Sequence, residues 1–98
     1  MLSVSDAAPL LGAPSQGTKI TAVAYKPTSL VVDADVSRDA PNSTVGLRTD
    51  QKVLKVRGAK LSLLSDGVYE LLVDPAGNPR PAAGEFRHTE IVVDFAAR

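Results

Sequence analysis

Oxygen-bearing side chains that lie close together in the sequence are the most direct candidates for chemistry in this chain. Asp33 and Asp35 stand at alternate positions of one apolar run, and Asp39 and Asn42 follow soon after. Alternate residues of a strand share a face, so the two carboxylates would point to one side, as calcium ligands do. The glycine and the terminal glutamate of an EF-hand loop are missing. We therefore predict that the chain holds no metal ion. Asp33, Asp35 and Asp39 are the candidate ligands against which this prediction can be tested.

The residues that enzymes use for catalysis are scarce. His88 is the only histidine and there is no cysteine, so a metal site with two imidazoles or a thiolate cannot form within one chain. A catalytic histidine would also need a nucleophile and an orienting carboxylate, which the sequence does not mark. No glycine-rich phosphate loop and no nucleophile elbow is present. We predict that the protein is not an enzyme and needs no cofactor.

Basic residues gather in the middle of the chain. Residues 41–60 carry five cations and one anion, a net charge of +4, whereas residues 1–40 sum to −1 and residues 61–98 to −3. Strand alternation turns Arg48, Lys55 and Arg57 outward, and neighbouring strands would join them in one patch. Such a patch either protects a sheet edge or meets an acidic surface on a partner or a second copy. Because no aromatic residue lies within it, nucleic acid is not an expected partner.

Seven short apolar runs separated by turn signals must position these residues. Their starts lie mostly eight to ten residues apart, the spacing of an all-β sandwich or barrel. No segment has a sustained apolar stripe with helical spacing. The runs are Ile20–Tyr25, Leu30–Val36, Thr44–Thr49, Lys52–Val56, Lys60–Leu64, Val68–Val73 and Arg87–Phe95.

Alternation within these runs predicts which side chains form the core. One residue in two should face inward on a strand that has one buried face. Ser65–Gly67 has the Asp-Gly signal of a tight hairpin turn. The residues expected to face inward are Leu30, Val32, Ala34, Val36, Val45, Leu47, Leu54, Val56, Ile91, Val93 and Phe95.

The size of the chain, 98 residues, suits one domain, and its formal net charge is zero. A global attraction to nucleic acid or to an anionic membrane is therefore not expected. No apolar run approaches the roughly 20 residues of a membrane helix. The first residues lack the basic and apolar regions of a signal peptide. The localisation stays open: a virion or the cytoplasm is favoured, or the exterior of the cell if a signal was removed.

Two segments outside the apolar runs are candidates for binding a partner. Residues 1–17 form an arm rich in small residues and turn formers, which is either a flexible leader or orders against a partner. Residues 74–85 form a loop with three prolines, which lose little entropy when they dock. We divide the chain into this arm and one β-domain, residues 18–98. The candidate contacts are Leu2, Val4, Leu10 and Leu11 in the arm and Pro79, Arg80 and Pro81 in the loop.

The seven runs, with a long final one, resemble immunoglobulin-like modules over residues 18–95. The resemblance implies an antiparallel β-sandwich of about seven strands. The chain has no tryptophan and none of the Cys…Trp…Cys signature of true immunoglobulin domains. A small β-barrel, which has the same strand rhythm, is the alternative.

These observations predict a non-enzymatic structural protein, a subunit of a larger assembly such as a virion (capsid decoration or tail) or a surface lattice. It would bind neighbouring protein chains, or copies of itself, through the arm, the charged patch and the proline-rich loop. The alternative is an accessory or carbohydrate-binding module of a secreted or cell-surface protein. For a glycan partner, only Tyr25 and Tyr69 could supply the ring on which sugars commonly stack.

Overall fold

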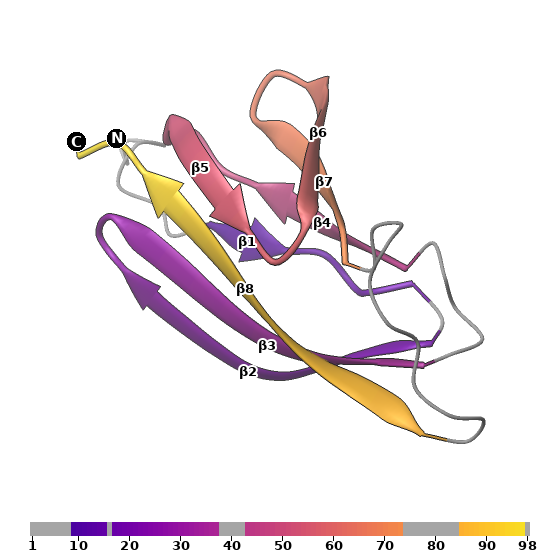
Figure 1. Cartoon of the computed structure of the whole chain (residues 1–98). Helices are drawn as coiled ribbons and strands as arrows, with labels where there is room; N and C mark the ends of the chain where they lie inside the picture. Colours follow the sequence, from indigo (N-terminus) through magenta and orange to yellow (C-terminus); the bar gives the residue numbers. More distant parts are fainter. Residues whose placement is uncertain (1–8, 16, 38–42, 74–84, 98) are drawn as a thin grey trace.

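Eight antiparallel strands make up the fold, shown by the computed structural model in Figure 1. The structure describes residues 9–15, 17–37, 43–73 and 85–97, and no helix occurs within these ranges. The strands are β1 (Leu10–Leu11), β2 (Thr18–Lys26), β3 (Ser29–Ser37), β4 (Thr44–Arg48), β5 (Val53–Arg57), β6 (Lys60–Ser65), β7 (Val68–Leu72) and β8 (Phe86–Phe95).

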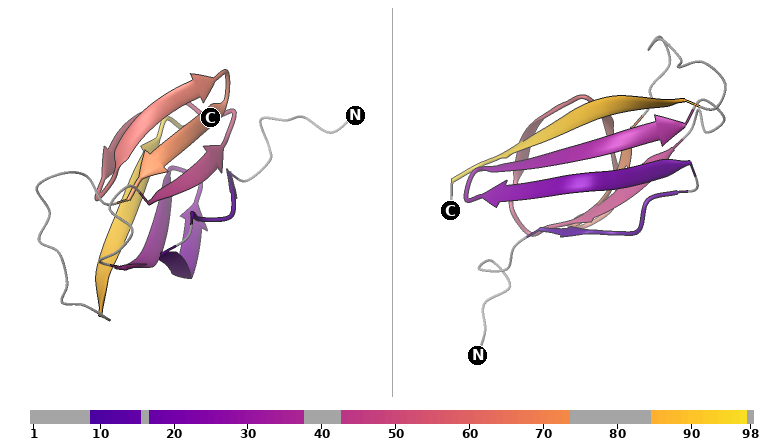
Figure 2. Two further views of the ribbon diagram at one scale, coloured as in Figure 1. Left: turned by 90° about the vertical axis from the view of Figure 1, so that its right-hand side faces the viewer. Right: turned by 90° about the horizontal axis from the view of Figure 1, so that it is seen from below.

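The strands form two four-stranded sheets. Sheet A has the order β1-β4-β7-β6, and sheet B has the order β2-β3-β8-β5. Every pair of neighbours is antiparallel. Figure 2 shows one sheet lying over the other. The prediction of an all-β sandwich is confirmed, in preference to the closed barrel.

The strand order differs from that of an immunoglobulin constant domain. Counted along the chain without the two-residue β1, the seven longer strands have the orders 1-2-7-4 and 3-6-5. An immunoglobulin constant domain has 1-2-5-4 and 3-6-7. The fifth and seventh strands are therefore exchanged between the sheets. The resemblance extends to a two-sheet antiparallel sandwich and not to the order of its strands.

The core fills the space between the two sheets and is built by alternation. On β3 every second residue from Leu30 to Val36 is buried, and the C-terminal half of β8 follows the same pattern. Val45 and Leu47 supply the matching positions of β4, and Leu71 and Val73 come from β7 and just after it. The predicted inward residues of β3, β4 and β8 are confirmed. Asp66 and Gly67 turn between β6 and β7 as expected, with Gly67 at a positive φ of 74°.

Strand β5 departs from the predicted pattern. The register between β5 and β8 shifts between Val53 and Lys55, so Leu54 occupies a β-bulge. Leu54 is 60% exposed, whereas Val53 and Val56 pack against the core. The prediction that Leu54 faces inward is therefore wrong, because the extra residue of a bulge breaks the alternation of faces along its strand.

Part of the predicted arm belongs to the sandwich. Leu10 and Leu11 pair with β4 as strand β1, and Leu11 packs against the core. Past β1, the N–H of Gly12 donates to the Gly46 carbonyl at 2.9 Å. Further along, the Ser15 N–H donates to the Thr44 carbonyl at 2.9 Å, and the Thr44 N–H donates to Ser15 Oγ at 2.8 Å. This segment thus follows β4 along its length within the same chain.

Candidate functional site

A trough crosses the outer face of sheet A where two neighbouring residues, Gly12 beyond the end of the edge strand β1 and Gly46 of β4, have no side chain. Gly46 of β4 lies beside Gly12, and a Cβ atom at Gly46 would have no neighbour closer than the Gly12 Cα at 3.9 Å. Leu10 of β1 and Leu64 of β6 stand at the sides of the trough, 63% and 59% exposed. The volume is about 300 Å³. We call this feature the sheet A trough.

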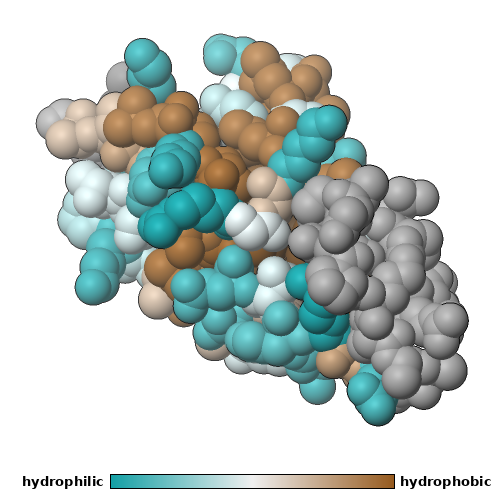
Figure 3. Space-filling view, in the orientation of Figure 1, coloured by the Kyte–Doolittle hydropathy of each residue, from teal (hydrophilic) through white to brown (hydrophobic). Residues whose placement is uncertain are grey.

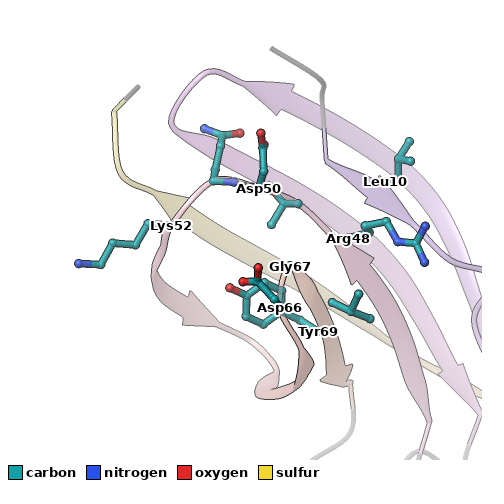
Figure 4. Close-up of a pocket in the computed structure, with 10 residues that line it drawn as sticks. Leu10, Arg48, Asp50, Lys52, Asp66, Gly67 and Tyr69 are labelled. Carbon is teal, nitrogen blue, oxygen red and sulfur yellow. Dashed lines mark hydrogen bonds between the residues drawn. The ribbon is translucent and has the colours of Figure 1, made fainter. Parts of the chain in front are cut away.

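A larger cleft adjoins the trough at the end of β4. Its volume is about 680 Å³, and Leu10, Arg48, Val68 and Tyr69 line both features. The remaining walls are the β4–β5 loop, residues 49–52, and the turn Asp66–Gly67. Figure 4 shows that the lining side chains come from β1, β4, β7, the loop and the turn. We call this feature the end cleft, and it has both cations and carboxylates around an apolar floor.

Hydrogen bonds hold the β4–β5 loop that forms one wall of the end cleft. Gln51 is 95% buried: its Oε1 accepts from the Tyr25 hydroxyl at 2.8 Å, and its Nε2 donates to the Pro27 carbonyl at 2.9 Å. Within the loop, the Gln51 N–H donates to Thr49 Oγ1 at 3.0 Å. The Thr49 N–H donates to the Gly67 carbonyl at 2.9 Å. The loop is therefore fixed to the β2–β3 turn on one side and to the β6–β7 turn on the other.

We expect Gln51→Ala to lower the free energy of unfolding by about 1–3 kcal/mol, because it truncates a 95% buried side chain and removes both of the hydrogen bonds that this side chain makes to Tyr25 and Pro27. Tyr25→Phe keeps the ring and removes only the donor to Gln51 Oε1, so it should cost less, about 1 kcal/mol. Urea denaturation of both variants measures the difference. Wild-type stability of Gln51→Ala would show that this side chain does not hold the loop.

The structure brings together only some of the predicted contact residues. Leu10 and Arg48 are partners in the β1–β4 register and line both the trough and the cleft. Leu11 is partly buried against the core and also lines the trough. The predicted patch of Arg48, Lys55 and Arg57 is wrong: the chain crosses from sheet A to sheet B between β4 and β5, so these two strands are not neighbours. Outside the described residues lie Leu2, Val4, Asp39, Pro79, Arg80 and Pro81.

A second surface lies where the edge strands β5 and β6 follow one another. We call residues 52–65 the β5–β6 rim. Its cations Lys52, Lys55, Arg57 and Lys60 are all exposed and form no ion pair within the described part of the chain, and the segment contains no acidic residue. Figure 3 shows apolar and polar residues interleaved over β5 and β6. The exposed leucines of the rim are Leu54, Leu63 and Leu64.

A third surface occupies the outer face of sheet B. Asp33 and Asp35 of β3 lie opposite Glu90 and His88 of β8, and we call Asp33, Asp35 and Glu90 the acidic face. His88 stands between the two aspartates, with Nδ1 at 3.2 Å from Asp35 Oδ1 and Nε2 at 3.7 Å from Asp33 Oδ1. The predicted common face of Asp33 and Asp35 is confirmed. The contact with His88 was missed, because its partner is 53 residues away in the sequence.

Other kinds of site are not found in the described ranges. There, no group of three or more His, Asp or Glu side chains is placed to hold a metal ion. The same ranges contain no helix with the length and apolar character needed to cross a bilayer.

Comparisons with known proteins give no guide to the family: no protein-family model, curated protein or solved structure matches the chain. The function must therefore be argued from three surfaces: the sheet A trough with its end cleft, the β5–β6 rim and the acidic face.

Proposed function

We propose that the protein is a non-enzymatic structural subunit that binds neighbouring protein chains, copies of itself included. The observation that supports this best is a set of leucines that are about 60% exposed on edge strands of both sheets: Leu10, Leu54, Leu63 and Leu64. Leu63 and Leu64 are adjacent, and Leu64 shares the trough with Leu10. Removing apolar surface from water contributes about 25 cal/mol per Å², and clustered exposed apolar side chains mark interaction sites.

The charges around the trough and the end cleft fit the same function. Arg48, Asp50, Lys52 and Asp66 surround the apolar residues at the end cleft. An apolar centre with a charged margin is the usual construction of a protein–protein interface, in which the margin sets orientation more than affinity. A virion or a surface lattice remains the setting predicted from the sequence.

The first test is the solution mass of the protein, measured by light scattering over a hundredfold range of concentration. We expect the mass to rise above that of the monomer as the concentration increases. A monomer at every concentration would contradict self-association.

Filling the trough tests its part in association. Gly46→Val places a β-branched side chain where the nearest atom to its Cβ lies at 3.9 Å, so we expect the stability to change by no more than about 1 kcal/mol. The dissociation constant for a neighbouring chain should rise roughly tenfold, or about 1.4 kcal/mol. Thr44→Val, on the same face of β4 but outside the trough, is the matched control. Equal association of both variants would remove the trough from the interface.

Carbohydrate binding is the second candidate function, and the end cleft is the observation that favours it. Tyr69 lines the cleft together with Asp50 and Asp66, and an aromatic ring beside carboxylates is suited to a sugar. Saturable binding of a glycan in a panel, weakened by Asp66→Asn, would favour this function over assembly.

A further inference from the structure

We propose that two copies of the chain pair through strand β2, edge to edge and antiparallel, so that their two B sheets join into one sheet of eight strands. The inference rests on the proposed function, because it names a contact through which copies associate, and it uses a surface separate from the trough and the rim. Three observations support it: the exposure of β2, the direction of its free backbone groups, and the side chains that a two-fold pairing brings together.

Strand β2 is the outer strand of sheet B, and its second half is open to solvent. Among the described strands it pairs with β3 alone, and Figure 1 shows it at the margin of the sheet. All five residues from Ala22 to Lys26 are exposed. Val23 pairs with the fully buried Val32 and so lies on the inner face of sheet B, yet it is 51% exposed. Sheet A therefore leaves this part of the inner face uncovered.

The other edge strands have features that oppose strand pairing. Strands β5 and β6 each contain a bulge and carry cations, and β1 has only two residues. Charges, bulges and short length are the means by which natural sheets protect their edges. The bulge of β2 lies at Thr21, and the segment that follows it, residues 22–25, has no charge, no proline and no irregularity in its register. Of the four edges, this segment is the one best suited to accept another strand.

The backbone of this segment points hydrogen-bonding groups away from the sheet at two residues. The Ser37 N–H donates to the carbonyl of the residue before β2 at 2.7 Å, so every second residue of β3, counted back from Ser37, directs its backbone groups toward β2. Val31 belongs to this set, and its register partner is Ala24. Ala24 therefore directs its own groups toward β3. The N–H and C=O groups of Val23 and Tyr25 point to the free edge.

A two-fold axis at Ala24 makes this segment its own partner. In that register Val23 of each copy lies opposite Tyr25 of the other, and the free backbone groups of the two residues join them. A β-branched side chain opposite an aromatic ring is a favourable cross-strand pair. Tyr25 is 37% exposed and already held in place: its hydroxyl donates to Gln51 Oε1 at 2.8 Å, and its ring stands edge-on to Phe95 with the centroids 6.5 Å apart.

The same register keeps the charges of the two strands apart. Lys26 of each copy lies opposite Ala22 of the other, and Lys19 falls outside the paired segment. The two Ala24 side chains meet on the outer face, where their small size lets the strands approach. Hydrogen-bonding phase, side-chain size and charge are therefore all self-complementary in one register, which favours a second copy over a strand of a different protein.

The contact is isologous and closes at two copies. Five paired residues give an edge roughly 17 Å long, and the two sheets are about 10 Å apart. The pair then buries on the order of 500 Å², less than the roughly 1,200–2,000 Å² of stable complexes. We therefore expect a weak dimer whose affinity comes mainly from main-chain hydrogen bonds. A weak contact suits a subunit with other binding surfaces, because linked contacts reinforce one another.

Opposite charges placed at the two-fold axis test the contact by light scattering. Ala24→Glu and Ala24→Lys each set like charges directly opposite one another, so each variant alone should associate roughly fivefold more weakly than the wild type. An equimolar mixture should regain the association, because opposite charges then meet. Ala22→Glu, on the same face, is the matched control: it lies opposite Lys26 of the second copy and should not weaken association. If an Ala24 variant fails to fold, Val23→Ser removes the contact with the Tyr25 ring at a half-exposed position and should weaken association by a similar factor.

A cysteine at the axis tests the register. The chain has no cysteine, so a single introduced thiol can form a disulfide only with the same position of a second copy. Cα atoms of a non-hydrogen-bonded antiparallel pair are about 4.5 Å apart, within the range of a disulfide. Ala24→Cys should therefore give a disulfide-linked dimer on mild oxidation. Lys26→Cys is the control, because its two thiols would stand four residues apart, roughly 13 Å, which is too far for a disulfide.

The outcomes separate the inference from the proposed function. Recovery in the mixture, with a disulfide that forms faster at residue 24 than at residue 26, supports the pairing. If the wild type associates and both Ala24 variants associate as strongly, the contact is wrong and the structural role stands. Weakened variants that do not recover on mixing, or a disulfide that forms no faster at residue 24, also overturn the two-fold pairing. A wild type that is monomeric at every concentration contradicts both the pairing and the self-association in the proposed function.

Discussion

Leu71→Ala is expected to lower the free energy of unfolding by about 3–4 kcal/mol. Leu71 is fully buried on β7, a central strand of sheet A, and it pairs with Val45 on one side and Leu61 on the other. Truncation removes the transfer free energy of the side chain and leaves a cavity between two sheets that strand pairing holds in place. Because small domains have only about 5–15 kcal/mol in total, this loss would be a large fraction of the stability.

Leu63→Ala is the matched control for this prediction. Leu63 lies on the neighbouring strand β6 and is 66% exposed, so its truncation should cost about 0.5 kcal/mol or less. Urea denaturation of both variants, with equal m-values, measures the two costs on one scale. Equal losses for Leu63 and Leu71 would contradict the assignment of Leu71 to the core and of Leu63 to the surface.

The core was predictable from the sequence because alternation assigns faces without knowledge of the partner strand. On β3 the period of two runs without interruption from Leu30 to Val36, and all four inward positions are buried. β4 and the second half of β8 behave in the same way. Leu54 broke the rule, since a β-bulge depends on the pairing between β5 and β8, which local sequence does not encode.

The candidate surfaces were less predictable because they depend on contacts between distant segments. The trough exists only because Gly12 and Gly46 are brought side by side, and nothing in either local sequence indicates the other. The division of the basic residues between two sheets follows from the crossing after β4, which strand rhythm does not reveal. What the sequence did contain was the segregation of charge, because the acid-free stretch from residue 52 to residue 65 is continuous along the chain.

Gly58→Ala should destabilise the fold by about 2–4 kcal/mol. Gly58 lies between β5 and β6 at a φ of +84°, a conformation that costs an L-residue roughly 1–2 kcal/mol. A Cβ atom there would also overlap the Glu90 carbonyl oxygen and lie 3.1 Å from its carbon. This carbonyl belongs to the backbone of β8, which pairs with strands on both sides and cannot move aside, so the turn must lift away. Gly46→Ala, with no positive φ and no close neighbour, should leave the stability within about 1 kcal/mol.

The close approach of Gly58 to Glu90 connects the stability of the fold with the proposed association of copies, because the turn positions the rim and its exposed leucines. The turn after β5 fixes where the cations of the rim stand relative to the acidic face. A folded Gly58→Ala protein would have the same charges as the wild type, but its rim would be displaced. We expect thermal unfolding at a lower temperature and, below that temperature, weaker association by light scattering. If Gly58→Ala were as stable as Gly46→Ala, the β5–β6 turn would be able to move away from β8 at no cost. The turn would then not fix the position of the rim relative to the acidic face.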